Sequence, residues 1–231
     1  MIKAILMDFN GVIINDEPIQ MQAYQEVLGA EGVEVTDESY LASLGMDEEA
    51  FVRNAYKIRD KSVPEDRLAD LIAAKQAKWR EVVAKELPLF GGIKDFVEKM
   101  AQEFSIGIVS MAPREEINMV LTQAGIRHHF TTIVSAEDVS EHKPDPECYR
   151  IGFRQLDAAR TAQGHLPMTH GECLVIEDSP PGVQAARNAD LPALGVTNTV
   201  SADELRAAGA DAVAKDLRDW FPDSIRRVFT S

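Results

Sequence analysis

The sequence predicts an α/β protein: a doubly wound (Rossmann-like) parallel sheet core with an inserted all-helical cap domain. Two observations support this fold class. Short apolar runs recur along the chain, most of them followed by a helical pattern, which is typical of buried parallel strands covered on both faces. Between about residues 15 and 90 this alternation stops and only helical patterns occur. We therefore expect a core domain formed by residues 1–14 and 91–231, and a helical cap domain formed by residues 15–90.

The expected strands are the short apolar runs of the core. They lie at Ile2–Met7, Ser105–Val109, Thr131–Val134, Cys173–Ile176 and Pro192–Val196. The carboxyl ends of parallel strands meet at one edge of a sheet, where the ligand site of such folds lies. Three runs end in polar residues, namely Asp8, Ser110, and Glu177 with Asp178. We expect these side chains to converge on one crevice.

The expected helices of the inserted block have Pro and Gly at their ends. They lie at Pro18–Gly29, Asp37–Leu44, Asp47–Arg59 and Pro64 to about Lys85. The chain returns to the core through Leu87–Gly92, which has the turn chemistry of a hinge. The block is therefore interpreted as a lid that excludes water from the site. In the core, Asp157–Glu172 is interpreted as a longer surface connection.

Composition and charge narrow the possible partners. A chain of 231 residues with 45% hydrophobic content is typical of a folded globular protein. Its 38 acidic and 24 basic residues give a formal charge of −14, which repels nucleic-acid phosphates and anionic membranes. The two cysteines lack metal-ligand spacing, and no 18-residue apolar stretch occurs. We expect a cytoplasmic protein that binds neither nucleic acid nor membrane.

The run Asp8-Phe9-Asn10-Gly11-Val12 stands where the first strand ends and a glycine-bearing turn begins. A carboxylate exposed there can attack phosphorus and divide one hard displacement into two easier ones. The alternative interpretation is that Asp8 only caps a turn.

A second acidic run, Val175 to Gly182, places Glu177 and Asp178 at a strand end before a helix. An anionic nucleophile that attacks an anionic phosphate needs a cation between them, and clustered carboxylate oxygens suit Mg²⁺. The alternative is a solvated acidic turn in which Ser179 caps a helix. Because two strand ends of this kind occur in one chain, the metal interpretation is favoured.

Ser110 and Lys143 are candidates for phosphate binding. The Ser110 hydroxyl and the amides that follow it, beginning with Met111, precede a helix that starts near Pro113. Lys143 stands just ahead of two prolines, where a fixed cation can neutralise charge on a transferring group. The simpler interpretations are a helix cap for Ser110 and a surface loop for Lys143.

In order and spacing, the four segments at Asp8, Ser110, Lys143 and Glu177 with Asp178 resemble the four motifs of the haloacid dehalogenase superfamily. The similarity is greatest to its phosphatases and beta-phosphoglucomutase-like enzymes. It covers essentially the whole chain, because the helical block lies where that family inserts its helical cap.

The resemblance implies a Mg²⁺-dependent phosphatase that acts on a small phosphorylated metabolite through an aspartyl-phosphate on Asp8. It makes Asp8 the nucleophile and a metal ligand, and Ser110 and Lys143 the phosphate-binding pair. The main-chain carbonyl of Asn10, together with Glu177 and Asp178, completes the metal site. The expected oligomeric state is a monomer or a weak homodimer.

Asn10 departs from the family pattern, in which a second Asp serves as general acid and base. An amide cannot replace it, and that contribution is typically worth about 10²–10⁴-fold in rate. Three interpretations remain open. The chain is an enzyme of low activity, which uses leaving groups that need no proton or borrows another acid such as Glu17. Alternatively it is a catalytically quiet binding or regulatory protein, or an engineered form in which Asp was replaced.

The inserted block contains further departures. Gln20 stands where a His is common in this subgroup, and Glu48 stands where the mutases carry a phosphate-gripping Arg, which disfavours a sugar-phosphate mutase. Metal-free dehalogenase chemistry is disfavoured by Glu177 and Asp178. Arg53 and Lys75 are candidate substrate-binding residues of the block, with solvated helix-face charges as the alternative.

Overall fold

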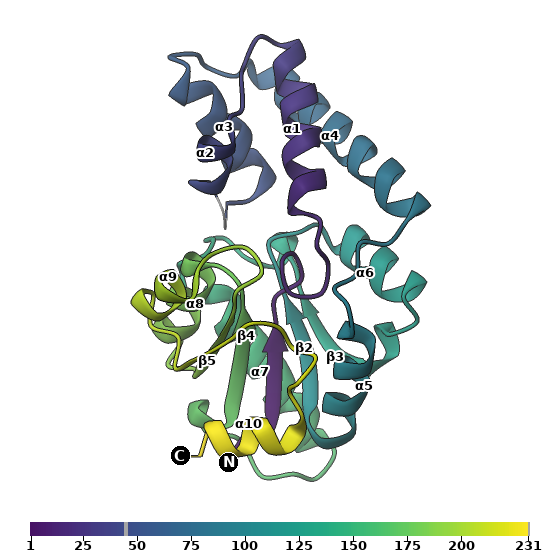
Figure 1. Ribbon diagram of the computed structural model, residues 1–231, viewed down its shortest axis with the longest axis vertical. Helices are drawn as coiled ribbons and strands as arrows, with labels where there is room; N and C mark the ends of the chain where they lie inside the picture. The colour runs from purple at the N-terminus through teal and green to yellow at the C-terminus, as the bar shows by residue number, and fades with distance from the viewer. Residues whose placement is uncertain (44–45, 231) are drawn as a thin grey trace. The chain divides into compact units, whose positions relative to one another are not determined.

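The structure is a computed structural model that describes residues 1–43 and 46–230 of the chain (Figure 1). Its contacts divide the chain into two compact units. The α/β unit is formed by Met1–Asn15 and Leu89–Ser231, and the helical unit by Asp16–Pro88.

The α/β unit is built on a parallel sheet, as the sequence predicts. Within the described residues the sheet has six strands in the order β3-β2-β1-β4-β5-β6, and every neighbouring pair is parallel. The strands are β1 (Ala4–Met7), β2 (Ser105–Val109), β3 (Phe130–Val134), β4 (Cys173–Glu177), β5 (Ala193–Val196) and β6 (Ala212–Ala214). Because β1 pairs with both β2 and β4, the first motif lies at the centre of the sheet.

Helices cover the sheet and its ends. They are α5 (Ile93–Glu103), α6 (Arg114–Gln123), α7 (Glu147–Ala162), α8 (Pro180–Asn188), α9 (Ala202–Ala207) and α10 (Pro222–Val228), with short 3-10 helices at Arg127–His129, Ala136–Asp138 and His170–Glu172. Alternate residues of β1, Ala4 and Leu6, belong to one buried cluster with residues of α7 and α8. The central strands are buried throughout, which explains why their sequences are continuous apolar runs.

The prediction of a surface connection over Asp157–Glu172 is wrong for its first part. Helix α7 continues to Ala162, because Cys148, Tyr149 and Leu156 form a buried stripe that packs into the core. Asp157 lies within this helix, and its carboxylate accepts a hydrogen bond at 2.7 Å from the amide of Met168, which lies in the connection after the helix.

The helical unit consists of α1 (Glu17–Ala30), α2 (Asp37–Leu41), α3 (Glu48–Ile58) and α4 (Glu65–Lys85). The second expected helix is shorter than predicted, and Leu44 lies outside the described residues. The core of the helical unit contains the rings of Tyr24 and Phe51, which stack with centroids 3.9 Å apart. The buried carboxylate of Asp16 accepts hydrogen bonds from Gln20 at 2.8 Å and from the Trp79 indole at 2.7 Å, so α4 is tied to the start of α1.

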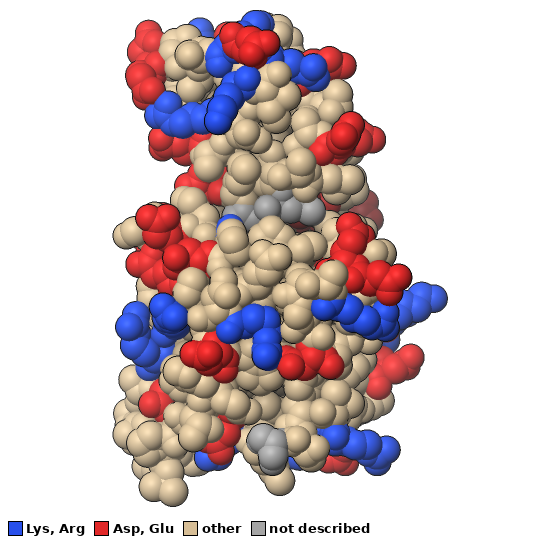
Figure 2. Space-filling view, turned by 90° about the vertical axis from the view of Figure 1, so that its left-hand side faces the viewer, with Lys and Arg blue, Asp and Glu red and all other residues tan. Residues whose placement is uncertain are grey.

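Charged side chains of both signs are interspersed over the face of the molecule drawn in Figure 2. In the part of the chain that the structure describes, no helix has the length and apolar character needed to cross a membrane.

Candidate active site

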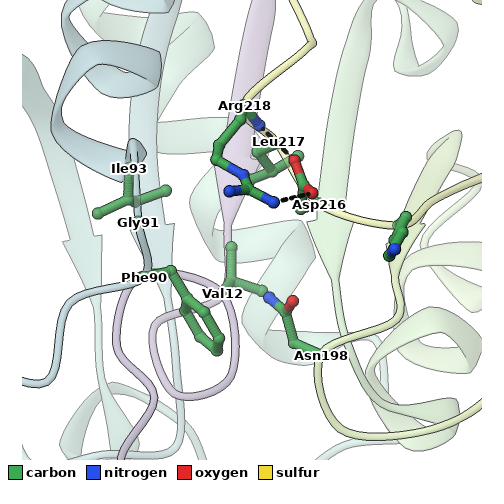
Figure 3. Close-up of a pocket in the computed structure, with 9 residues that line it drawn as sticks. Val12, Phe90, Gly91, Ile93, Asn198, Asp216, Leu217 and Arg218 are labelled. Atoms are coloured by element: carbon green, nitrogen blue, oxygen red, sulfur yellow. Dashed lines mark hydrogen bonds and ion pairs between the residues drawn. The ribbon is translucent and has the colours of Figure 1, made fainter.

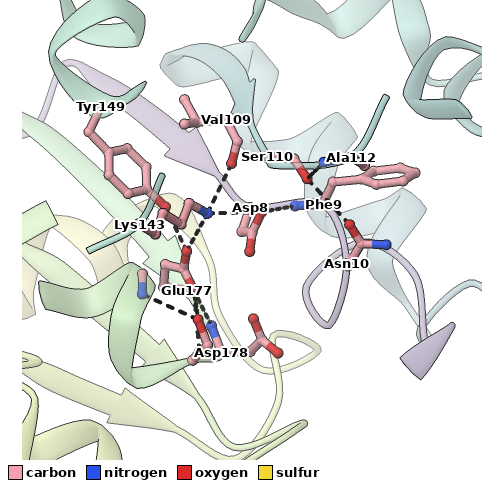
Figure 4. Close-up of polar contacts among 12 residues, drawn as sticks. Asp8, Phe9, Asn10, Val109, Ser110, Ala112, Lys143, Tyr149, Glu177 and Asp178 are labelled. Carbon is pink, nitrogen blue, oxygen red and sulfur yellow. Dashed lines mark hydrogen bonds and ion pairs between the residues drawn. The ribbon is translucent and has the colours of Figure 1, made fainter. Parts of the chain in front are cut away.

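Asp8 directly follows β1, and β1 is flanked by β2 and β4 (Figure 4). Its amide donates to the Ile176 carbonyl at 3.0 Å, which continues the pairing of β1 with β4. Its carboxylate Oδ1 accepts a hydrogen bond from the Phe9 amide at 2.7 Å and lies 3.2 Å from the Lys143 ammonium. The side chain is therefore held in one orientation at the carboxyl end of the central strand.

Lys143 links the first motif to the fourth. Its Nζ lies 2.6 Å from Glu177 Oε1 and donates to the Val109 carbonyl at 3.4 Å. The hydroxyl of Tyr149 donates to the same Glu177 oxygen at 2.8 Å (Figure 4). The ammonium is thus fixed between two buried carboxylates, because a buried cation requires paired charges. The structure excludes the surface-loop interpretation of Lys143.

Glu177 also organises the start of α8. Its Oε2 accepts hydrogen bonds from the Asp178 amide at 3.0 Å and from the Ser179 hydroxyl at 3.0 Å. Ser179 caps α8 by accepting from the Gly182 amide at 3.3 Å. A Cβ at Gly182 would lie 1.8 Å from Glu177 Oε1, so glycine is required for the helix to begin against this carboxylate. The predicted helix cap is present alongside the acidic pair.

Asp178 approaches the turn that follows Asp8. Gly11 has φ 72°, and a Cβ there would lie 1.8 Å from Asp178 Oδ2. A side chain at position 11 would strain the backbone and would collide with the Asp178 carboxylate, so glycine is needed there. Thr199, which follows β5, donates a hydrogen bond from its hydroxyl to Asp178 Oδ2.

Ser110 follows β2, and its amide donates to the Val134 carbonyl at 3.0 Å. Its hydroxyl donates to Asn10 Oδ1 at 3.3 Å and accepts from the Ala112 amide at 3.1 Å (Figure 4). The structure therefore joins the first and second motifs directly. Met111 lies between Ser110 and Ala112 and is half-buried, ahead of α6.

The electrostatics of the site are dominated by buried negative charge. The pKa of Asp8 is raised from 3.8 to about 7, because burial and then the charge of Glu177 raise it more than Lys143 and the Phe9 amide lower it. Burial also acts to raise the pKa of Glu177, but Lys143 and hydrogen bonds outweigh it, so the Glu177 pKa is lowered. For Lys143, burial lowers the pKa while Asp8 and Glu177 raise it further, and the net shift is upward. Lys143 is therefore a permanent cation.

Asp8, Glu177 and Asp178 form a candidate metal site. Each is buried, and each offers a carboxylate oxygen within 4.8 Å of the other two. Lys143 pairs with two of these carboxylates, Asp8 and Glu177, so the group of three retains an excess of negative charge that a divalent cation would compensate. The donor set therefore fits Mg²⁺.

The two candidate residues of the helical unit are engaged by carboxylates of that unit. Arg53 donates to Glu65 at 2.7 and 2.9 Å and to Glu49 at 2.9 Å. Lys75 is buried and lies 2.8 Å from Glu48 Oε1. Glu48, which stands where the mutases carry an Arg, is thus the ion-pair partner of the buried Lys75.

Sequence reasoning missed Tyr149, Asn198 and Thr199. Asn198 donates from its side-chain amide to the Gly11 carbonyl at 2.8 Å, and Thr199 contacts Asp178. Both follow a predicted strand, so the strand-end argument that found Asp8 would also have found them. Tyr149 lies inside α7 with no motif around it, and no sequence signal indicated its role.

Comparison with known proteins shows the family to which the chain is similar. A family model described as haloacid dehalogenase-like hydrolase matches residues 5–196. The chain is 29% identical over 221 residues to the validoxylamine A 7'-phosphate phosphatase of Streptomyces hygroscopicus subsp. limoneus, covering 95% of this chain and 96% of that protein.

A longer relative and a solved structure complete the comparison. The chain is 28% identical over 223 residues to the chloroplastic protein SUPPRESSOR OF QUENCHING 1 of Arabidopsis thaliana, covering 94% of this chain but only 20% of that protein. The crystal structure of a beta-phosphoglucomutase from Clostridium difficile matches with a TM-score of 0.86 and 18% identity, covering 99% of this chain and 97% of that one. At this identity the match shows the fold alone.

Proposed function

Because the chain belongs to the haloacid dehalogenase-like hydrolases, we propose that it is a Mg²⁺-dependent phosphatase of a small phosphorylated metabolite, with Asp8 as nucleophile. One observation supports this most strongly: Asp8, Lys143, Glu177 and Asp178 lie together at the carboxyl end of the central strands, beside Ser110 and Asn10. The relative whose name is validoxylamine A 7'-phosphate phosphatase supports a phosphomonoester as substrate. In this proposal the helical unit has the role of the family's cap.

Asp8 attacks the phosphorus through one carboxylate oxygen. The Phe9 amide and the Lys143 ammonium both contact Oδ1, which leaves Oδ2 as the attacking atom. The phosphorus–oxygen bond to the leaving alcohol breaks as the bond to Oδ2 forms, which gives an aspartyl-phosphate and an alkoxide. Water then cleaves the acyl phosphate and regenerates the carboxylate.

The transferring group is held by fixed positive and dipolar groups. The Ser110 hydroxyl and the amide of Met111 bind its oxygens, and the Lys143 ammonium offsets their charge. Mg²⁺, held by Asp8, Asp178 and the main-chain carbonyl of Asn10 with Glu177 beside them, would offset the repulsion between carboxylate and phosphate.

Asn10 limits this chemistry. Its side chain accepts a hydrogen bond from Ser110, but an amide neither protonates an alkoxide nor takes a proton from water near neutral pH. Substrates with good leaving groups are therefore favoured, and hydrolysis of the aspartyl-phosphate is slow. The same observation favours a second candidate function, a protein that binds a phosphorylated ligand without turning it over.

Hydrolysis of two phosphomonoesters tests the proposal. p-Nitrophenyl phosphate releases a phenolate that needs no proton, whereas a simple alkyl phosphate such as glycerol 2-phosphate requires one. Asn10→Asp should raise turnover of the alkyl phosphate by about 10²–10⁴-fold, and turnover of the aryl phosphate by less. Asp8→Ala should abolish both reactions. Asn15→Asp, which changes an exposed asparagine nearby, is the matched control and should change neither.

Equal turnover of the alkyl phosphate by Asn10→Asp and the unchanged chain would contradict the role given to residue 10. Activity that survives Asp8→Ala would contradict the nucleophile. If the unchanged chain binds phosphate but turns over neither ester, the binding function replaces the enzymatic one.

A further inference from the structure

A pocket lies in the α/β unit beside the loop that follows Asp8 (Figure 3). Its volume is about 350 Å³, within the range of small-molecule sites. Four segments that are distant in sequence form its walls: the loop containing Val12, the stretch from Phe90 to Ile93 that leads into α5, Asn198 after β5, and the stretch from Lys215 to Arg218 that follows β6. The proposed phosphatase reaction does not use these walls.

The interior of the pocket is apolar and includes an aromatic ring. Val12, Ile93 and Leu217 are buried and present aliphatic side chains. The ring of Phe90 is half-buried and is drawn on one side of Val12 in Figure 3. A planar apolar group would bury this surface and stack on the Phe90 ring, a contact worth more than its area alone.

The rim of the pocket carries a positive charge, Lys215, that no carboxylate pairs within the described residues. Arg218 folds back onto Asp216, with its guanidinium 2.8 Å from the carboxylate, and the Arg218 amide donates to the same carboxylate at 2.9 Å (Figure 3). Lys215 is exposed, and across the described residues its ammonium makes no hydrogen bond or ion pair; its charge acts on Asp216 only as a minor influence that lowers the Asp216 pKa. Among the residues that line the pocket, two cations and one anion leave a net charge of +1, in a protein whose formal charge is −14. Asp219, next to Arg218, adds a negative charge on the Arg218 side of the rim.

The pocket adjoins the candidate active site through two of its walls. Val12 is four positions after Asp8 in the same loop. Asn198 lines the pocket and donates to the Gly11 carbonyl at 2.8 Å. An occupant would therefore contact both the loop that presents the nucleophile and the side chain that holds this loop.

We propose that this pocket binds a small planar molecule with one anionic group, of the aromatic carboxylate class, whose ring packs between Phe90 and Leu217 and whose anion pairs with Lys215. The aliphatic walls and the ring select a flat apolar body. A single anionic group matches the single unpaired ammonium, and Arg218 is already neutralised by Asp216.

4-Fluorobenzoate tests this site on the full chain, with ¹⁹F NMR to measure affinity and methyl NMR to locate the probe. Binding should be saturable and should shift the Val12 methyl resonances through the ring of the probe. Lys215→Glu should weaken binding by about tenfold or more, the size of a lost charge-assisted contact. Because Lys215 is exposed, this variant keeps the fold. Lys57→Glu, which reverses an exposed lysine of the helical unit, should leave the affinity unchanged.

Two further binding measurements distinguish this pocket from the proposed phosphate-binding site at Ser110. Ser110→Ala should leave the affinity for 4-fluorobenzoate unchanged, whereas 4-fluorobenzyl alcohol, which has the ring but not the charge, should bind about tenfold more weakly or worse. Equal affinity in the unchanged chain and Lys215→Glu would overturn the proposal. So would loss of binding in Ser110→Ala, or saturation without a shift at Val12. None of these readouts requires phosphatase activity.

Discussion

Asp8 of the α/β unit and Glu17 of the helical unit are both carboxyl groups whose pKa is raised to about 7, mainly by burial. Their surroundings differ. Asp8 lies against a full positive charge, Lys143, and close to a second buried carboxylate, Glu177. Glu17 accepts a hydrogen bond from the neutral hydroxyl of Tyr40 at 2.5 Å, and the charges that act on it are Asp16 and, as the weakest of these influences, Lys75.

The two raised pKa values therefore arise in different surroundings, which would be satisfied in different ways. Around Asp8 the carboxylate oxygens of three residues converge, and a divalent cation would satisfy them together. Around Glu17 the partners are helix side chains, and a proton is enough to satisfy the group. We therefore expect Asp8 to respond to metal and Glu17 to respond to pH.

The largest expected effect comes from removing the cation beside Asp8. Lys143→Met leaves Asp8 and Glu177 buried without their partner, which should destabilise the fold by about 3–5 kcal/mol and abolish hydrolysis. Lys75→Met is the matched comparison, because Lys75 is also buried but forms its ion pair with Glu48, which keeps Gln76 as a donor. The Lys75 ammonium also lies over the Tyr24 ring. Urea unfolding measures both. A larger loss in Lys75→Met would break the distinction drawn between the two regions.

Metal should act on the α/β unit through Asp178. A ligand that binds only the folded state at 100 times its Kd stabilises it by about 2.7 kcal/mol, so Mg²⁺ should raise the melting temperature. Asp178→Ala should abolish this rise, whereas Asp70→Ala, at an exposed position of α4, should retain it. Differential scanning calorimetry with and without Mg²⁺ checks this. A full response in Asp178→Ala would place the ion elsewhere.

A smaller effect is expected from pH at Glu17. Its folded pKa of about 7 lies above its ordinary value of 4.5, so the folded state binds the proton more tightly. The contribution of Glu17 to the free energy of unfolding is therefore greatest below pH 4.5, falls as pH rises to about 7, and is level above it, with a total change of roughly 1–3 kcal/mol. Glu17→Gln should remove this decline.

Urea unfolding at pH 5 and pH 8, in Mg²⁺ to hold the state of Asp8 constant, measures the Glu17 effect. The gain from Glu17→Gln should be greater at pH 8 than at pH 5. Glu38→Gln, at an exposed position of α2, should show no such dependence. A gain that is the same at both pH values would mean that Glu17 titrates normally.

The sequence was sufficient for the central sheet because its strands are buried on both faces and read as unbroken apolar runs. The strand β6 escaped prediction because Ala212–Ala214 is short, lies at the edge of the sheet and is flanked by Asp211 and Lys215. The end of α7 escaped because Asp157–Ala162 contributes little of the buried stripe and continues a helix fixed by Leu156 and earlier residues.

The candidate site was predictable to the extent that its residues end strands. Asp8, Ser110 and Glu177 with Asp178 were placed by that rule, and Asn198 and Thr199 obey it too. The hydroxyl of Tyr149 reaches Glu177 only because α7 packs across the sheet, which is a tertiary contact without a local pattern. The double role of Gly11, in turning the chain and admitting Asp178, likewise becomes visible only in three dimensions.

The most direct test of the central claim is the burst of p-nitrophenolate when the unchanged chain, with Mg²⁺, is mixed with p-nitrophenyl phosphate. Because Asn10 cannot activate water, attack by Asp8 should outrun hydrolysis of the aspartyl-phosphate. We predict a burst of one p-nitrophenolate per chain, with one phosphoryl group found on Asp8 by mass spectrometry of the acid-quenched protein. Steady release with no burst and no modified chain, or a phosphoryl group on another residue, would contradict the account.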